Sequence, residues 1–445
     1  MTDISPAETV PFNLPAYHSK SLSEYFVLSA LKKMKKGGLR VDFRNEPSRY
    51  FGEPGALVTA SVTINSPAKF FNHCAFYGDI GLGQAYTESL WDTDDIKAVI
   101  SWFIENLNEL QGTNTKSTNI PSVNFLTILN WVQHLKRRNS VTMSRRNIAE
   151  HYDLGNDFYA LWLDPTMTYS SAKFQRPDQS EPVFKVTVTD DGEGVDGAQF
   201  RSLQEAQQNK YEALCKKLHL KSNDHILEIG CGWGGFALYA AQKYGCRITG
   251  VTISQAQANW AKNKIAAVGL QDQITILVED YRHVTGRYDK IVSIEMLEAV
   301  GHHYHNAFFS KCHEVLQPHG LLGVQMITVP DYRYPSLKKS VDWIQRHIFP
   351  GSLLLSVGRI NQVLLNTSDL FLHDLEDLGN DYARTLAAWH QNFNAHLPQI
   401  RALGFDEPFI RSWNYYLKYC EAAFATRNIS VVQAIYTRPN NKTLC

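Results

Sequence analysis

Alternating apolar and polar blocks in the second half of the chain predict a sheet flanked by helices. From residue 211 onward, short apolar runs suited to buried strands alternate with longer segments of helical periodicity. The predicted strands cover 225–229, 247–251, 274–278 and 290–294, and the predicted helices cover 211–218, 236–242 and 256–268. Because this alternation builds a parallel, doubly wound α/β sheet, we expect ligands at the carboxyl ends of its strands.

The first third of the chain predicts a smaller α+β unit. Residues 23–36 have the pattern of a helix with lysines on one side, and the alternating residues 55–64 predict a strand. A further element at 69–77 is expected to pack on that strand. The apolar side of the helix is expected to consist of Phe26, Ala30, Leu31 and Met34.

A polar segment separates the two regions. Residues 111–121 contain few apolar side chains, which is typical of a linker. An apolar helix predicted at 125–135 then runs into three basic residues at 136–138. This helix either contacts anionic lipid headgroups or is a solvated connecting helix. The pattern thus predicts an N-terminal domain (1–110), a linker with an amphipathic helix (111–140) and a C-terminal domain (141–445).

Charge and cysteine content argue against several classes of protein. Lys plus Arg and Asp plus Glu number 44 each, so the chain lacks the basic excess of a general nucleic-acid binder. Its seven cysteines form no CxxC pair, which favours a reducing compartment over disulfides or a structural zinc. The first residues lack a signal-peptide pattern, and no window approaches about 18 uninterrupted apolar residues. We therefore expect a cytoplasmic protein that meets a membrane only at its surface.

A glycine turn follows the first predicted strand of the C-terminal domain. Gly230, Gly232 and Gly235 satisfy G-x-G-x-x-G, the pattern of dinucleotide-binding turns. Such folds place an acidic residue about 20 positions later to bind the ribose hydroxyls. This chain has GVTIS at 250–254 and offers no carboxylate there. The glycine pattern alone is therefore weak evidence for a nicotinamide cofactor.

The residue order around the same turn favours S-adenosylmethionine. Glu228 precedes Gly230, Gly232 and Gly234 in the order E-x-G-x-G-x-G, which is expected of a methyltransferase. The Glu228 carboxylate is positioned to hold the amino-acid end of the cofactor, while the glycines let the backbone approach its nucleoside. Asp280, after the third predicted strand, is a candidate acceptor for the adenine amino group.

The segment after the fourth predicted strand narrows the choice of methyl acceptor. Methyltransferases that act on nitrogen often carry an Asn/Asp-Pro-Pro-aromatic turn there, whereas this chain continues as SIEMLEAVG at 293–301. Amide nitrogen is therefore disfavoured. The histidines that follow, His302 and His305, have no carboxylate or cysteine at ligand spacing, so we expect no metal site.

Several ordered motifs resemble the cyclopropane-fatty-acyl-phospholipid synthase family, which includes the mycolic acid cyclopropane synthases. The resemblance covers about 140 to the end and, more loosely, 20–110. The motifs are HYDLGNDFY (151–159), MTYSSA (167–172), IGCGWGG (229–235), GVTIS (250–254), EMLEAVG (295–301), IFPG (348–351) and GNDY (379–382).

The resemblance implies a class I methyltransferase fold, a lipid-recruiting N-terminal domain and a defined reaction. The enzyme would transfer the methyl group of S-adenosylmethionine to the cis double bond of an acyl chain in a membrane phospholipid. An alkene is a weak nucleophile, so a carbocation follows the transfer, and closure of a cyclopropane ring requires loss of a proton. The family resemblance implies bicarbonate as the base, a peripheral location at the inner membrane surface and a homodimer.

The resemblance also implies which residues form the site. Those that would hold the base are Glu298, Tyr382, Ser171, Gln325 and the main chain of Ile327. Those that would bind the cofactor are Tyr169, Ser170, Gly230, Gly232, Gly234, Thr252, Gln257, Asp280 and Tyr281. Glu298 can accept a hydrogen bond from the base and Tyr382 can donate one.

Two of these positions depart from the best-known bacterial members. Ser171 stands where they have cysteine, and Gln325 stands where they have histidine. Both residues can still hydrogen-bond an anion. The changes nevertheless leave open an enzyme that methylates the alkene without closing a ring. A lipid-binding protein without turnover is a further alternative, and a nucleic-acid methyltransferase is a more distant one because the chain has no basic stripe with interleaved aromatic residues.

Overall fold

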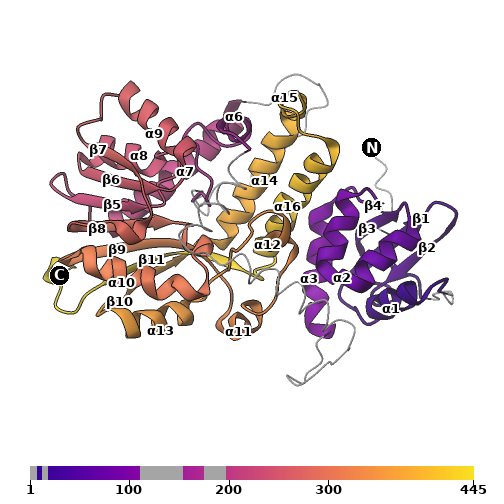
Figure 1. The fold of residues 1–445 in the computed structure, drawn as a ribbon. Coiled ribbons are helices and arrows are strands. Elements are labelled where there is room, and N and C mark those ends of the chain that lie inside the picture. The colour runs from indigo at the N-terminus through magenta and orange to yellow at the C-terminus, as the bar shows by residue number, and fades with distance from the viewer. Residues whose placement is uncertain (1–7, 13–18, 111–153, 175–196, 445) are drawn as a thin grey trace, which may run out of the picture. The chain divides into compact units, whose positions relative to one another are not determined.

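The structure is a computed structural model that describes residues 8–12, 19–110, 154–174 and 197–444. The linker, the helix expected at 125–135 and its basic extension lie outside these residues. Contacts divide the described residues into two compact units, each of which is considered by itself (Figure 1). The first unit contains the described residues up to 110 together with Lys339–Pro350 and Gly404–Asn428, and the second contains the remainder. The sequence pattern had placed both of these later segments in the domain 141–445.

A four-stranded sheet with the order β2-β1-β3-β4 forms the centre of the first unit. Strand β1 is antiparallel to β2 and parallel to β3. The strands are β1 (Gly38–Phe43), β2 (Glu46–Phe51), β3 (Val58–Ile64) and β4 (Trp91–Asp92). The helices are α1 (Leu22–Leu31), α2 (Pro67–Thr87), α3 (Ile96–Leu110), α12 (Trp343–His347) and α16 (Glu407–Ala425).

Local chemistry explains how this unit assembles. Helix α1 begins after Ser21, whose hydroxyl accepts a hydrogen bond from the backbone N–H of Glu24. Phe26 is 55% exposed, so the prediction that it lies on the buried side with Leu31 was wrong. Helix α12 docks on α2 where Gly83 lacks a side chain: an added Cβ there would lie 2.4 Å from Trp343 Cδ1.

A seven-stranded sheet with the order β10-β11-β9-β8-β5-β6-β7 forms the centre of the second unit. The neighbouring strands from β9 to β7 pair in parallel, whereas β11 is antiparallel to both of its neighbours. The strands are β5 (His225–Ile229), β6 (Arg247–Thr252), β7 (Ile274–Val278), β8 (Tyr288–Ile294), β9 (Leu316–Thr328), β10 (Phe371–Asp377) and β11 (Ser430–Thr437). The four strands predicted from the pattern are therefore confirmed.

Helices cover both faces of this sheet. The α-helices of this unit are α6 (Asn156–Ala160), α7 (Gly197–Lys217), α8 (Gly235–Tyr244), α9 (Gln255–Ala267), α10 (His305–Val315), α11 (Tyr334–Leu337), α13 (Val357–Thr367), α14 (Gly379–Ala395) and α15 (Leu397–Ala402). Within the described residues, no helix is both long and apolar enough to cross a bilayer.

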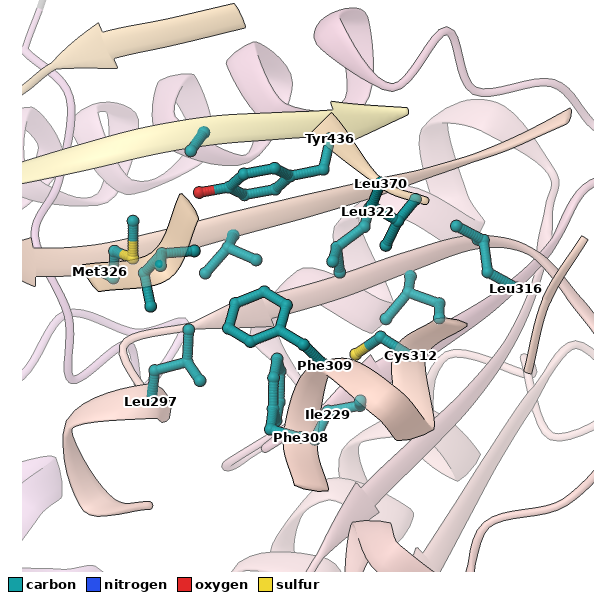
Figure 2. Packing of buried hydrophobic residues seen from close by; sticks show 14 of the residues in the cluster. Ile229, Leu297, Phe308, Phe309, Cys312, Leu316, Leu322, Met326, Leu370 and Tyr436 are labelled. Atoms are coloured by element: carbon teal, nitrogen blue, oxygen red, sulfur yellow. The ribbon is translucent and has the colours of Figure 1, made fainter. Parts of the chain in front are cut away.

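Alternate residues of each strand serve two separate cores. In β9, Leu322 belongs to a core with α10 and α13, whereas the preceding Leu321 belongs to a core with α7, α8 and α9. Figure 2 shows the first of these cores, in which Phe309 of α10 points toward Leu322 and Tyr436 of the sheet. The two cores fix the strand ends, where the candidate site lies.

Two neighbouring leucines of α13 test this packing. Leu364 is 2% exposed in the core that Figure 2 shows, whereas Leu365 is 83% exposed. We expect Leu364→Ala to lower the free energy of unfolding by about 2–5 kcal/mol, because it leaves a cavity. The matched Leu365→Ala should change it by no more than about 0.5 kcal/mol. Urea unfolding of both variants measures the difference, and equal losses would contradict the assignment of the core face.

Candidate active site

The turn between β5 and α8 depends on glycine. Gly230, Gly232 and Gly234 have φ angles of 83°, 52° and 85°, which residues with side chains rarely adopt. A Cβ added at Gly230 would lie 2.7 Å from Cγ of Met296, whereas one added at Gly232 would meet nothing within 4 Å. The turn therefore packs closely on one side and leaves room beside Gly232.

Glu228 lies beneath this turn and retains unused hydrogen-bonding capacity. It is 4% exposed, and the backbone N–H of Ala237 donates to its carboxylate. Its Oε2 has no hydrogen-bond partner among the described residues. Burial raises the pKa of Glu228 to about 8, although the charge of Lys210 opposes the shift. A free carboxylate oxygen beside an open glycine turn fits the ammonium group of S-adenosylmethionine.

The other predicted cofactor residues that come after β5 in the sequence lie at or just after the ends of β6 and β7. Thr252 ends β6 and donates its hydroxyl hydrogen to Gln257 Oε1 at 3.0 Å. Asp280 follows β7, and the Arg282 guanidinium donates to its two oxygens at 2.7 Å each. Tyr281 packs edge-on against Phe308. A carboxylate has lone pairs to spare, so Asp280 can still accept a bond from an adenine amino group.

Aromatic rings surround Tyr169. Its ring centroid lies 5.6 Å from Tyr159, 5.4 Å from Trp162 and 5.3 Å from Trp389. Trp389 also lies 6.0 Å from Tyr382, its neighbour on α14. Electron-rich ring faces of this kind stabilise a cation. The sequence analysis included Tyr169 but missed Trp389, which only the helix geometry brings here.

A single carboxylate joins three of the residues predicted to hold the base. Glu295 follows the end of β8, and its Oε1 accepts hydrogen bonds from Ser171 N and Gln325 Nε2, both at 2.8 Å. Its Oε2 accepts one from the Tyr382 hydroxyl, also at 2.8 Å. Glu295 was not among the predicted site residues and appears only as the first letter of the motif EMLEAVG. Its signal was a second acid three positions before Glu298, at the end of a predicted strand.

Glu298 is the second carboxylate of the candidate site. It is 8% exposed, and its Oε1 accepts a hydrogen bond from Ile327 N, while its Oε2 has no partner among the described residues. Burial, and then the nearby charge of Glu295, raise the pKa of Glu298 to about 8. Glu298 is therefore mainly protonated at neutral pH.

The two serines before Ala172 have different surroundings. The Ser171 hydroxyl donates to Ala172 O at 3.0 Å, so only the main chain of Ser171 donates to Glu295. The Ser170 hydroxyl accepts a hydrogen bond from Lys210 Nζ at 2.7 Å. The side chain of Ser171 therefore takes no direct part in the carboxylate network.

Two residues that the sequence analysis missed support the network. Lys210 is fully buried, and burial lowers its pKa to about 7, although the charge of Glu295 and of two further carboxylates opposes this. Gln433 of β11 donates from Nε2 to Gln325 Oε1 at 3.1 Å, which directs the Gln325 amide nitrogen toward Glu295. Nothing local in the sequence marks either residue, because each contact joins distant parts of the chain.

Comparison with known proteins places this chain in a family. The family model for mycolic acid cyclopropane synthetase matches residues 139–434. The chain is 33% identical over 373 residues to the tuberculostearic acid methyltransferase UfaA1 of Mycobacterium tuberculosis, covering 84% of this chain and 82% of that one. It is 32% identical over 385 residues to the cyclopropane-fatty-acyl-phospholipid synthase of Escherichia coli K12, covering 85% and 88%.

Solved structures agree with this assignment. The mycolic acid cyclopropane synthase CmaA1, determined with SAH and CTAB, is 29% identical with a TM-score of 0.56, covering 66% of this chain and 98% of that chain. The chain therefore belongs to the mycolic acid cyclopropane synthetase family. It is an S-adenosylmethionine-dependent methyltransferase with the class I fold, as the sequence motifs predicted.

The perturbed pKa of Glu298 predicts a dependence of stability on pH. Folded Glu298 keeps its proton up to about pH 8, whereas the unfolded side chain loses it near 4.5. Between these values the folded protein binds more protons, so stability falls as pH rises, by up to about 1.4 kcal/mol per pH unit for one group. We expect Glu298→Gln to match the wild type near pH 5 and to be more stable near pH 8. Urea titrations across this range measure the effect, and parallel stability curves would contradict it.

Proposed function

We propose that the chain transfers the methyl group of S-adenosylmethionine to the cis double bond of an unsaturated acyl chain in a membrane phospholipid and closes a cyclopropane ring. The observation that carries the proposal is the pair of carboxylates beside the glycine turn, the half-buried Glu295 and the buried Glu298. Met296, between them in sequence, would contact a Cβ added at Gly230. The printed name of the Escherichia coli relative supports the choice of acceptor.

The described residues suit each requirement of this reaction. When bound, S-adenosylmethionine supplies an electrophilic methyl group, and the rings around Tyr169 and Trp389 can stabilise the positive charge that passes to the acyl chain. Ring closure then needs a base close to the reacting carbons. That base is either bicarbonate, which the resemblance implies, or a carboxylate of the chain itself.

We propose that the first unit recruits the lipid at the membrane surface. Leu22, Tyr25 and Phe26 of α1 are 71%, 56% and 55% exposed, and lysines follow this helix at 32, 33, 35 and 36. Exposed aromatic and apolar side chains next to cationic ones suit an anionic lipid surface. A peripheral location at the inner membrane surface and the homodimer that the resemblance implies stay predictions.

A second candidate reaction is methylation of the same alkene with proton loss to a methylene branch instead of a ring. The similarity to an enzyme named tuberculostearic acid methyltransferase favours it, together with Ser171 and Gln325. Attack on the methyl group is common to both reactions. They diverge at the cation: ring closure loses a methyl proton directly and forms the third ring bond, whereas the methylene branch requires a hydride shift from the methylated carbon to the positive carbon before a methyl proton is lost to form the double bond.

Product analysis in cells tests the proposal. We expect expression in bacteria that are rich in unsaturated phospholipid and lack their own synthase to give fatty-acid methyl esters heavier by one methylene unit. A cyclopropane survives mild hydrogenation, whereas a methylene branch takes up hydrogen, so mass spectrometry after hydrogenation separates the two. Absence of any heavier ester, together with no release of S-adenosylhomocysteine on liposomes, would contradict the proposal and favour a lipid-binding role.

Glu298→Gln tests the site within this reaction. If bicarbonate is the base, we expect Glu298→Gln to abolish product while leaving the affinity for S-adenosylmethionine nearly unchanged, because Glu298 Oε2, which has no partner among the described residues, would accept a hydrogen bond from it. Calorimetric titration of the cofactor provides the control for folding. Full activity of the Glu298→Gln variant would show that Glu298 has no catalytic role.

A further inference from the structure

The groups expected to hold an external base already have partners. A bicarbonate at this site would need donors from Ser171, Gln325, Tyr382 and the main chain of Ile327. The first three donate to Glu295, and Ile327 N donates to Glu298. The described residues therefore do not fit a bicarbonate in addition to both carboxylates, since the anion would have to displace one of them.

The carboxylate of Glu295 accepts hydrogen bonds from the donors that were predicted to hold such an anion. Two donors at 2.8 Å converge on Oε1 and a third at 2.8 Å reaches Oε2. A planar carboxylate and bicarbonate both present a pair of acceptor oxygens, so the same donors serve either species. Glu295 is only half-buried, which leaves part of it accessible to a substrate.

The backbone holds this side chain in place at some cost. Glu295 has a φ of 49°, in the left-handed region that residues with a Cβ rarely occupy. Its N–H donates to Gln325 O at 2.8 Å, so the main chain of β9 fixes the strained residue. Strain of this kind persists where the surrounding structure enforces it, and it is frequent at active sites.

We propose that Glu295 is the catalytic base and that it replaces the bicarbonate of related enzymes. This inference rests on the proposed function and changes only the identity of the base. Because the carboxylate belongs to the chain, the enzyme needs no dissolved anion.

The proton and electron balance of the step is complete. The alkene π electrons form a bond to the transferred methyl carbon as its bond to sulfur breaks, and the sulfur departs as a neutral thioether. The neighbouring alkene carbon is left positive. A C–H bond of the new methyl group then breaks, its electron pair forms the third ring bond, and the proton passes to a Glu295 oxygen. No oxidant or reductant is required.

The surroundings favour a charged Glu295 next to a neutral Glu298. Burial raises the pKa of Glu295 above its usual value, and the hydrogen bonds that it accepts and the charge of Lys210 oppose this rise. Three donors reach the Glu295 carboxylate, and these favour its charged form. Glu298 has only one hydrogen-bond donor and is more readily protonated. Carboxyl groups whose environments push their pKa values apart commonly divide the acid and base roles.

Two variants and one control test the proposal. Glu295→Gln keeps the shape but removes the base, and Glu295→Gly removes the carboxylate and leaves three donors without it. Glu314→Gln, which neutralises a largely exposed acid on α10, is the matched control. Each protein is assayed for lipid product in buffer depleted of carbon dioxide, with and without added bicarbonate. Binding of ¹³C-bicarbonate is followed by NMR, and cofactor affinity is followed by calorimetry.

The expected results form a distinct pattern. Wild type and Glu314→Gln should turn over equally with and without bicarbonate and should bind no ¹³C-bicarbonate. Glu295→Gln should lose about 10²–10⁴-fold in turnover while keeping its cofactor affinity. Glu295→Gly should lose activity in depleted buffer, bind ¹³C-bicarbonate saturably and recover part of its turnover when bicarbonate is added.

Two results would overturn the inference. One is loss of wild-type activity in depleted buffer with recovery on adding bicarbonate, and the other is near-normal turnover of Glu295→Gln in depleted buffer. Failure of the proposed function is distinguishable from both, because the wild type would then form no methylated lipid under either condition. In that case Glu295 would have no role as a catalytic base. The NMR measurement would still decide whether its carboxylate occupies the anion site.

Discussion

The candidate site of the second unit depends on one constraint: the half-buried carboxylate of Glu295 has lost part of its contact with water and must be stabilised by other groups of the chain. Transfer of a charge out of water is costly unless hydrogen bonds and an opposite charge replace the lost solvation. Glu295 obtains these from Ser171, Gln325, Tyr382 and Lys210, which come from four separate parts of the chain. These donors meet only when strands β8, β9 and β11 pair in the observed register. Helices α7 and α14 must also hold their positions on the sheet.

The same constraint explains how the turn that we propose binds the cofactor and the carboxylate that we propose as the base share one edge of the sheet. The glycine turn follows β5, and Glu295 follows β8, which pairs with β5. Met296 packs where Gly230 lacks a side chain, so the two regions are in contact and not merely adjacent. The aromatic ring of Tyr169, which packs on the buried Trp389, is the surface that we propose stabilises a cation here without adding another charge.

Much of the fold could be predicted from local pattern, because burial on both faces gives parallel strands continuous apolar runs. This accounts for β5, whose predicted bounds match the structure. The predicted bounds of β7 also match, although β7 lies at the sheet edge and is only partly buried. The attachment of α12 and α16 to the first unit was not predictable in this way, since it depends on long-range contacts such as that between Gly83 and Trp343. The site was predictable only in part. The resemblance identified Ser171, Gln325 and Tyr382, but their common partner requires the left-handed backbone of Glu295, which no periodicity indicates.

The most direct test of this account is a crystal structure of the protein with S-adenosylhomocysteine, grown in buffer that contains bicarbonate. The account predicts a single carboxylate, continuous in electron density with residue 295, within hydrogen-bond distance of Ser171 N, Gln325 Nε2 and the Tyr382 hydroxyl. A separate planar anion on those three donors, with the Glu295 side chain turned away, would contradict it.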